Sequence, residues 1–256
     1  MGLTTLRKAF LAPWDGRDRV GQIWLYALAD AQRRTDVAVH HAIRVVTHHH
    51  LSATPARANL PKFLKLFHHD VSCGINTLLA HERYDQPGEL LDDRSTHTMR
   101  LVDAPAQATT LQYEYLNCTA AGLVARPEHM PGYTFNFDLW KKGYLDVRRP
   151  DVYFSPSRPE VIRLEVTPPP LLLLHFNGDI DKLVYWMQRM AEEGTRELQA
   201  ASKGRTPLGA RKLRRMHPWS EPRTLRETRG SRIPTFRIGA RGITGRRLHI
   251  QGAAEV

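Results

Sequence analysis

Three consecutive histidines, His48, His49 and His50, are the residues of this chain best suited to chemistry. They follow a run of alternating β-branched residues, which indicates strands, and successive side chains on a strand point to opposite faces. His48 and His50 therefore share one face and His49 the other. Two neutral imidazoles so placed can reach one divalent metal ion, because their ordinary pKa of about 6.5 leaves them largely neutral at pH 7. Three histidines in a row are also typical of a partly exposed polar surface, so the interpretation depends on the rest of the chain.

A second pair of polar residues, Tyr113 and Asn117, lies four residues apart in a helix predicted to begin near Asp103, with Pro105 in its first turn. This spacing puts both side chains on one helical face, whereas Tyr115 lies about 200° around the helix from Tyr113. A phenol beside a metal held by two imidazoles and an amide oxygen suits phosphodiester transesterification. The metal polarises the phosphate, and the phenol becomes a nucleophile that forms a covalent phosphotyrosine.

The elements that position these residues follow from hydrophobic periodicity and from capping signals. Helices are expected over 16–35, 60–79, from 103 to before Gly122, 179–201 and 207–216. Strands are expected over 37–46, 48–55, 96–102, 152–154 and 161–166. Residues 232–238 are expected to be extended, and residues 1–14 give a weak strand signal. The order helix, strand, strand, helix, strand, helix predicts an α+β fold. We expect a ferredoxin-like antiparallel sheet with helices packed on one face. His68 and His69, within the second helix, are expected to be surface residues.

Composition limits the class of protein. The chain has 256 residues and 41% hydrophobic content, which is enough for a packed core in one large domain or two small ones. Its longest apolar run is far too short to span a membrane, and its first residues lack the apolar core of a signal peptide. The two cysteines, Cys73 and Cys118, have no CxxC spacing, which favours structural roles in a reducing cytoplasm.

The positive charge is concentrated near the C-terminus. Residues 203–247 contain fourteen Lys or Arg and two acids, a net charge of +12, while the whole chain carries +11, so the remainder carries −1. Such a basic segment indicates a polyanionic partner, and we expect that partner to be nucleic acid. Arg211, Lys212, Arg214 and Arg215 are the candidate DNA-binding residues within it, and a solvated charged surface is the alternative.

Two stretches, HHHLSATP and YEYLNCTAAGLVARPEHMPGY, resemble the motifs of the HUH single-strand transposases, and within them the REP-associated tyrosine transposase branch. The pattern of that branch is roughly NHxHLxxTP, then YxxxNPVxAGLV and a WPG-like turn, and the resemblance covers about residues 7–155. It implies a ferredoxin-like nuclease domain that uses Mg²⁺ or Mn²⁺ to cleave and transfer single-stranded or hairpin DNA through a 5′-phosphotyrosine. It assigns the metal to His48, His50 and Asn117, and the nucleophile to Tyr113.

The chain departs from this pattern at several supporting positions. Thr47 stands where the family favours Asn, His49 where a bulky apolar residue is usual, Cys118 in place of Pro, and Met130 in place of Trp. An aromatic-rich segment of the family is replaced by GELLDDR at 88–94. This pattern fits a diverged or domesticated copy, so the alternative is a non-catalytic DNA-binding protein that retains the fold. A metal-free RNA binder is a weaker third possibility, because the sheet lacks paired exposed aromatics.

These observations predict a transposase-like nuclease domain over residues 1–135 and a mostly helical C-terminal region over 136–256. The C-terminal region would contain the helix near 179–201 and the basic segment 203–247. We expect a cytoplasmic monomer or homodimer that acts on DNA and not at a membrane.

Overall fold

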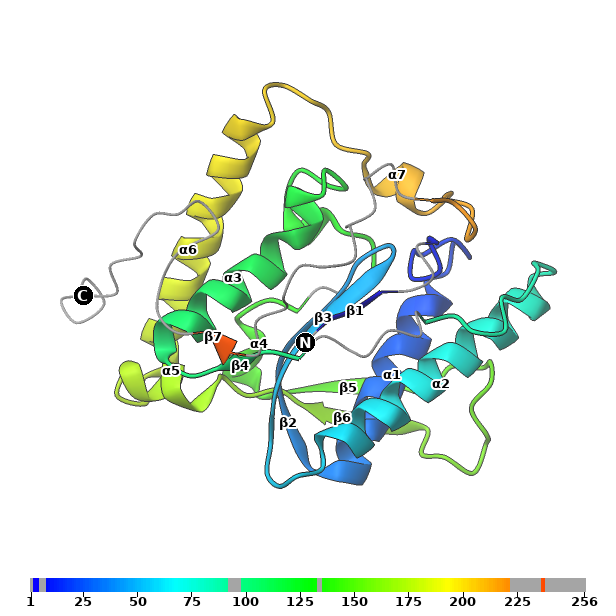
Figure 1. The fold of residues 1–256 in the computed structure, drawn as a ribbon, viewed down its shortest axis with the longest axis horizontal. Coiled ribbons are helices and arrows are strands. Elements are labelled where there is room, and N and C mark those ends of the chain that lie inside the picture. The colour runs from blue at the N-terminus through cyan, green and yellow to red at the C-terminus, as the bar shows by residue number, and fades with distance from the viewer. Residues whose placement is uncertain (1, 5–7, 92–97, 133–134, 222–235, 238–256) are drawn as a thin grey trace.

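The computed structural model describes residues 2–4, 8–91, 98–132, 135–221 and 236–237 (Figure 1). The fold is α+β, as predicted. The helices are α1 (Arg19–Thr35), α2 (Leu60–His81), α3 (Ala104–Ala120), α4 (Leu139–Lys142), α5 (Pro170–His175), α6 (Ile180–Ala201) and α7 (Ala210–Leu213), with a 3-10 turn η1 (Pro127–His129). The strands are β1 (Gly2–Thr4), β2 (Val37–Arg44), β3 (His48–Pro55), β4 (Arg100–Leu101), β5 (Tyr144–Arg148), β6 (Val161–Glu165) and β7 (Phe236–Arg237).

A three-stranded antiparallel sheet lies at the centre, with β3 between β1 and β2. Its hairpin aligns Ile43 with His50 and Arg44 with His49, and the register shifts between Val39 and His41. β5 and β6 form a separate antiparallel pair, and β4 pairs with β7 in parallel rather than joining the central sheet. The finer ferredoxin-like assignment therefore stays a prediction.

Helices cover both faces of the central sheet (Figure 1). On one face, the His49 ring lies 6.1 Å from the Trp24 ring of α1 and 5.2 Å from the Phe67 ring of α2. On the other face, His48 contacts Asn117 of α3. The prediction that the helices share one face is wrong, because almost every residue of β2 is buried and a strand buried on both faces needs cover on both.

Polar contacts connect the start of α1 to the end of β2. Asp18 caps the helix by accepting a hydrogen bond from the Gly21 amide, 3.2 Å away, and it also accepts one from Arg44 Nη2 at 2.6 Å. The Arg44 guanidinium also donates to the carbonyl of Leu11. The predicted apolar stripe of α1 is buried along its length, and it packs closely on α2, where a Cβ atom on Gly74 would lie 2.6 Å from Ile23 Cγ2.

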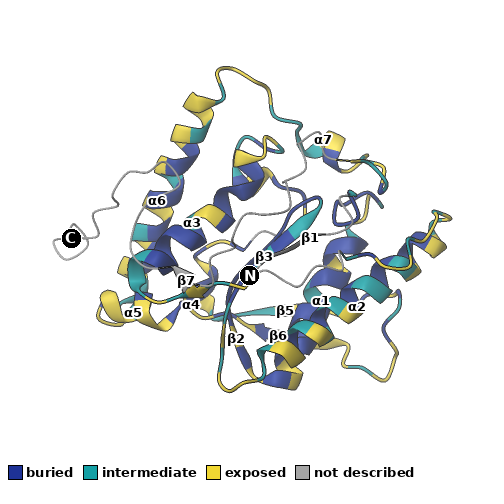
Figure 2. Ribbon diagram, in the orientation of Figure 1, coloured by how far each residue is buried: buried dark blue, intermediate teal, exposed yellow. Residues whose placement is uncertain are grey.

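Helix α3 lies between the sheet and the long helix α6, and it is buried over much of its surface (Figure 2). Asp103 caps it by accepting from the Ala106 amide at 2.7 Å, as the sequence predicts. Gln112 donates to the carbonyl of Met190 on α6 at 2.7 Å. The two helices approach closely because Gly194 has no side chain: a Cβ atom there would overlap Leu116.

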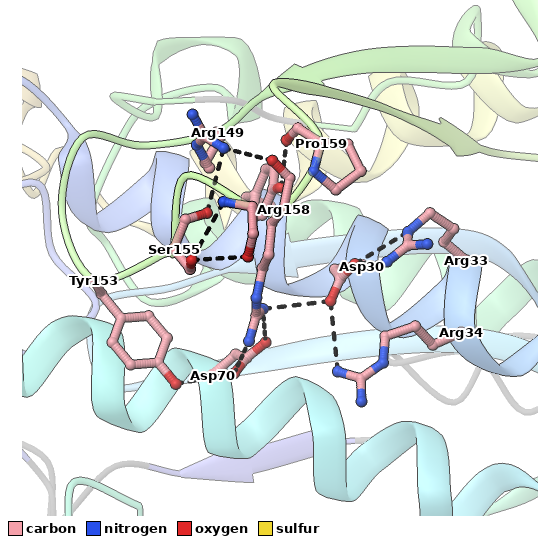
Figure 3. Close-up of polar contacts among 11 residues, drawn as sticks. Asp30, Arg33, Arg34, Asp70, Arg149, Tyr153, Ser155, Arg158 and Pro159 are labelled. Carbon is pink, nitrogen blue, oxygen red and sulfur yellow. Dashed lines mark hydrogen bonds and ion pairs between the residues drawn. The ribbon is translucent and has the colours of Figure 1, made fainter.

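The residues after 136 pack back onto the first part of the chain. Gln32 of α1 donates to the Glu165 carbonyl at 2.9 Å and accepts from the Glu165 amide at 2.8 Å. In the loop after β5, Arg158 pairs with Asp70 of α2 at 2.6 Å and with Asp30 of α1 at 3.3 Å (Figure 3). One hydrophobic core therefore joins both predicted regions.

Several predicted elements differ in extent. Residues 152–154 do not form a strand, since Tyr153 adopts a positive φ of 73° and its hydroxyl donates to Asp70. The strand expected over 96–102 is limited to β4, with 96–97 outside the described residues. The helix expected over 207–216 is limited to α7. In the described ranges, no helix is long and apolar enough to cross a membrane.

Candidate active site

The histidine triplet opens β3 with the predicted alternation. The rings of His48 and His50 lie on the α3 face, with their centroids 5.0 Å apart and their planes nearly perpendicular. His49 is buried on the opposite face, where its Nε2 lies 3.3 Å from His68 Nε2 of α2. His69 is exposed as predicted, but His68 is half-buried against His49, so its surface assignment is wrong.

Helix α3 brings the other two predicted site residues to this face. Asn117 Oδ1 lies 3.2 Å from His48 Nε2, although the two residues are 69 positions apart in the chain. One turn earlier, the Tyr113 ring lies 5.6 Å from the His50 ring. Asn117 is buried, whereas Tyr113 is 39% exposed. The structure therefore brings His48, His50, Tyr113 and Asn117 together, with the phenol on the side open to solvent.

Burial keeps the two histidines neutral. It lowers the pKa of His48, although the hydrogen bond to Asn117 acts in the opposite direction. It lowers the pKa of His50 to about 4, with Glu114 acting to raise it. Both imidazoles are therefore uncharged at pH 7, which is the form that binds metal ions. Thr47 stands where the motif of the transposases that the chain resembles has Asn. Its Oγ1 lies 3.1 Å from His48 Nδ1, so Thr47 contacts the second nitrogen of the His48 ring.

The donor set fits a divalent ion. His50 Nε2 is buried with no hydrogen-bond partner, and an unpaired buried polar atom is costly unless a ligand satisfies it. Imidazole nitrogens are typical ligands of first-row transition-metal ions, whereas Mg²⁺ prefers oxygen ligands, so this mixed set of two imidazoles and one amide oxygen does not select one divalent ion. Among the described residues, no three His, Cys, Asp or Glu side chains converge on a metal position. A metal site here therefore depends on Asn117 as the third protein ligand.

The neighbouring tyrosine is unsuited to nucleophilic attack. Tyr115 is almost fully buried, and its hydroxyl donates to Glu128 Oε1 at 3.0 Å. Burial and the nearby Glu128 carboxylate raise the pKa of Tyr115 well above that of free tyrosine. Its ring packs on Phe137, 5.1 Å between centroids. Of these two phenols on α3, Tyr113 is the one that is exposed to solvent.

A buried polar cluster, absent from the sequence prediction, lies beside the histidines. Glu114 of α3 accepts two contacts from Ser52 Oγ, both at 3.0 Å, and one from His41 Nδ1 at 3.1 Å. Burial acts to raise the pKa of Glu114, but the hydrogen bond and charge of His41 hold it below its ordinary value. Glu114 is therefore an anion next to Tyr113 in the chain. The strand alternation provided a signal for this cluster, because Ser52 shares a face with His50 and pairs with His41.

The predicted DNA-binding residues lie on and just after α7. Arg211, Lys212, Arg214 and Arg215, called here the α7 cation cluster, are exposed around the buried Leu213. The segment is joined to the loop after α3, since the amides of Leu208 and Gly209 donate to the carbonyls of Gly122 and Leu123 at 2.9 and 2.8 Å. The segment that leads into the cluster therefore lies against the loop that follows α3, the helix that carries Asn117. Residues 222–235 and 238–247 of the predicted basic segment lie outside the described residues.

Burial supports the structural role expected of Cys118, whereas the same expectation for Cys73 stays a prediction. Cys118 is buried, which raises its pKa to about 11 and leaves the thiol unreactive. Cys73 is a half-buried free thiol on α2 beside His69.

Comparison of the chain with protein-family models, with curated proteins and with solved structures finds no match.

Proposed function

We propose that this protein is a metal-dependent nuclease and strand transferase for single-stranded or hairpin DNA, of the HUH tyrosine transposase type. The observation that carries the proposal is the contact between His48 and Asn117, with the Tyr113 ring against His50. A protein that only binds DNA has no need to assemble two neutral imidazoles, an amide oxygen and an accessible phenol. A ferredoxin-like arrangement of the strands, with helices on both faces of the sheet, belongs to the same proposal.

In this proposal the reaction is a transesterification at phosphorus. The Tyr113 Oη–P bond forms as the bond from phosphorus to the 3′ oxygen breaks, leaving a 5′-phosphotyrosine and a free 3′-hydroxyl. The phenol proton passes to water, and the departing oxygen takes up a proton from water. His48, His50 and Asn117 would hold Mn²⁺ or Mg²⁺, and the bound ion would polarise the phosphate and neutralise its charge. Attack of a 3′-hydroxyl on the phosphotyrosine reverses the step and rejoins DNA.

The test is the covalent adduct on a hairpin oligonucleotide labelled at its 3′ end, because the DNA on the 3′ side of the cut stays attached to protein. We expect a shifted band on a denaturing gel with the wild-type protein and Mn²⁺. Tyr113→Phe should abolish that band while leaving DNA binding nearly intact, since only the nucleophilic oxygen is removed. Tyr115→Phe is the matched control on the same helix and should retain it. An adduct that survives in the first variant and disappears in the second would reverse the assignment.

A second candidate is a non-catalytic DNA-binding protein. The α7 cation cluster favours it, because four exposed cations can bind phosphates without any help from the histidine site. The two candidates differ in one measurement, since a binder forms a salt-sensitive complex but no covalent adduct with any metal. In either case we propose that the protein acts in the cytoplasm as a monomer or homodimer.

A further inference from the structure

A cleft of about 530 Å³ lies between the start of α1 and the end of β5, apart from the histidine site. Arg17, which precedes α1, lines one side together with Arg19, Gln22 and Leu25 of α1. Residues 145–151 line the other side. The volume is in the range of sites that hold a nucleotide-sized ligand.

Three arginines with no carboxylate partner line this cleft. Arg17 and Arg148 are exposed, and their guanidinium groups make no ion pair in the described part of the chain. Arg149 is held in place by its own loop, because its Nη1 donates to the carbonyls of Ser155 at 3.3 Å and of Arg158 (Figure 3). It also donates to the carbonyl of Pro156 at 2.7 Å. Carbonyl partners fix the Arg149 side chain without neutralising it. The cleft therefore carries a fixed positive charge beside two adaptable ones.

The remaining charged groups at the cleft are mostly neutralised by neighbours. Arg19 pairs with Asp15 at 3.0 Å and with Glu82, and Asp146 pairs with Arg163 at 3.0 Å. Asp151 is the carboxylate of the lining with no ion pair among the described residues. Unpaired cations thus outnumber unpaired anions, and the cleft favours an anionic ligand.

Part of the lining of the cleft is apolar. Leu25 and Leu145 are half-buried, and Val147 and Pro150 are buried. Guanidinium groups match phosphate oxygens in pairs, and flat bases stack on apolar side chains and on guanidinium planes. Phosphate-binding groups and apolar side chains in one cleft suit the phosphate and the base of a nucleotide.

We propose that this cleft binds one nucleotide unit of a nucleic-acid strand through Arg17, Arg148 and Arg149, as a second DNA contact outside the histidine site. That the strand is DNA rests on the proposed function. Arg17 is followed by Asp18, which pairs with Arg44 at the end of β2, and Arg44 lies opposite His49 in the hairpin. The cleft is therefore rigidly connected to the strand that carries the histidines, and it would hold a single-stranded extension of a hairpin whose stem is bound elsewhere.

The experiment measures fluorescence anisotropy with the full chain and three probes: a DNA hairpin, the same hairpin with a single-stranded extension, and a labelled mononucleotide. The test variant is Arg17→Ala with Arg148→Ala. The control is Arg189→Ala with Arg196→Ala, which removes the same charge from exposed positions on α6.

We expect the test variant to bind the extended hairpin roughly tenfold more weakly at 0.15 M salt. Its slope of log K against log salt should be shallower by about 1.4, because two phosphates are no longer neutralised. The control variant should match the wild type, and the blunt hairpin should not distinguish the two variants. Equal binding of the extended hairpin by both variants would overturn the proposal, as would a wild-type chain that binds no DNA. Tight mononucleotide binding that disappears in the test variant would assign the cleft to a free nucleotide instead.

The adduct assay separates this inference from the proposed function. Below saturating DNA, Arg17→Ala with Arg148→Ala should form less Tyr113 adduct on the extended hairpin, in proportion to its weaker binding, whereas Arg189→Ala with Arg196→Ala should form as much as the wild type. A chain that forms no adduct but loses extension binding in this variant would contradict the proposed function and leave the cleft assignment standing.

Discussion

Replacing Glu114 by Gln should weaken both the folded state and the metal site while preserving the shape of the side chain. Glu114 is 2% exposed, and it accepts hydrogen bonds from Ser52 and His41, which lie on adjacent strands. It therefore joins α3 to the sheet one residue after Tyr113. The side-chain amide of glutamine has one oxygen and no charge. It can therefore replace some of the hydrogen bonds of Glu114, but it cannot replace the negative charge near His50.

The magnitude follows from the two partners. A hydrogen bond to a charged group contributes about 1.5–3 kcal/mol, against about 1 kcal/mol for a neutral one, so weakening the bonds to Ser52 and His41 should cost about 2 kcal/mol of unfolding free energy. Replacing a group that is hydrogen-bonded to a metal ligand typically lowers metal affinity by 10–100-fold. We expect Mn²⁺ affinity to fall about tenfold, because Glu114 is buried and anionic but touches no ligand directly.

Urea unfolding and calorimetric titration with Mn²⁺ measure the two effects separately. Glu193→Gln is the matched control, since Glu193 is an exposed carboxylate on α6 that pairs only loosely with Arg189, at 3.7 Å. It should change neither quantity by more than about 0.5 kcal/mol. Unchanged stability in Glu114→Gln would refute the buried network. Reduced stability with unchanged Mn²⁺ affinity would show that Glu114 holds the fold together but does not influence the metal.

Two other outcomes are expected. Lowering the pH from about 6.5 to about 4 should destabilise the protein, because burial lowers the pKa of His50 and His68 from 6.5 to about 4, so the unfolded chain binds more protons in that window. Between those pH values, each histidine lowers the free energy of unfolding by up to about 1.4 kcal/mol per pH unit. Urea titrations at pH 7 and pH 5 measure this change. A pH dependence that His68→Gln leaves unaltered would contradict the explanation. Replacing the α7 cation cluster by alanines should make the salt dependence of hairpin binding shallower by about 0.7 for each phosphate that the cluster had neutralised, and an unchanged slope would mean that the cluster does not bind DNA.

The helices were predictable because their signals are local. The boundaries of α1, α2, α3 and α6 agree with the predicted ranges to within a few residues, since each carries an apolar stripe with a capping residue or an early proline. β5 was missed, because its five residues include two charged ones and its conformation is set by pairing with β6. α7 is shorter than predicted, since Gly209 at its start has a positive φ of 84°.

The site was predictable where one rule of spacing decided it. Strand alternation places His48 and His50 together, and helical spacing places Tyr113 above Asn117. The meeting of these two pairs depends on α3 packing across β3, which no local pattern specifies. Glu114 was missed for the same reason: a carboxylate in a helix is ordinarily exposed, and this one is buried because Ser52 and His41 supply its hydrogen bonds.

The central claim is that Tyr113 becomes covalently joined to DNA. The most direct measurement is to trap the adduct on a hairpin oligonucleotide with Mn²⁺, digest both the DNA and the protein, and locate the modified residue by mass spectrometry. We predict a nucleotide that is joined through its 5′ phosphate to the hydroxyl of Tyr113, and that forms only when metal is present. A modification on Tyr115 or on any other residue, or DNA that is bound but never joined to the protein, would contradict this claim.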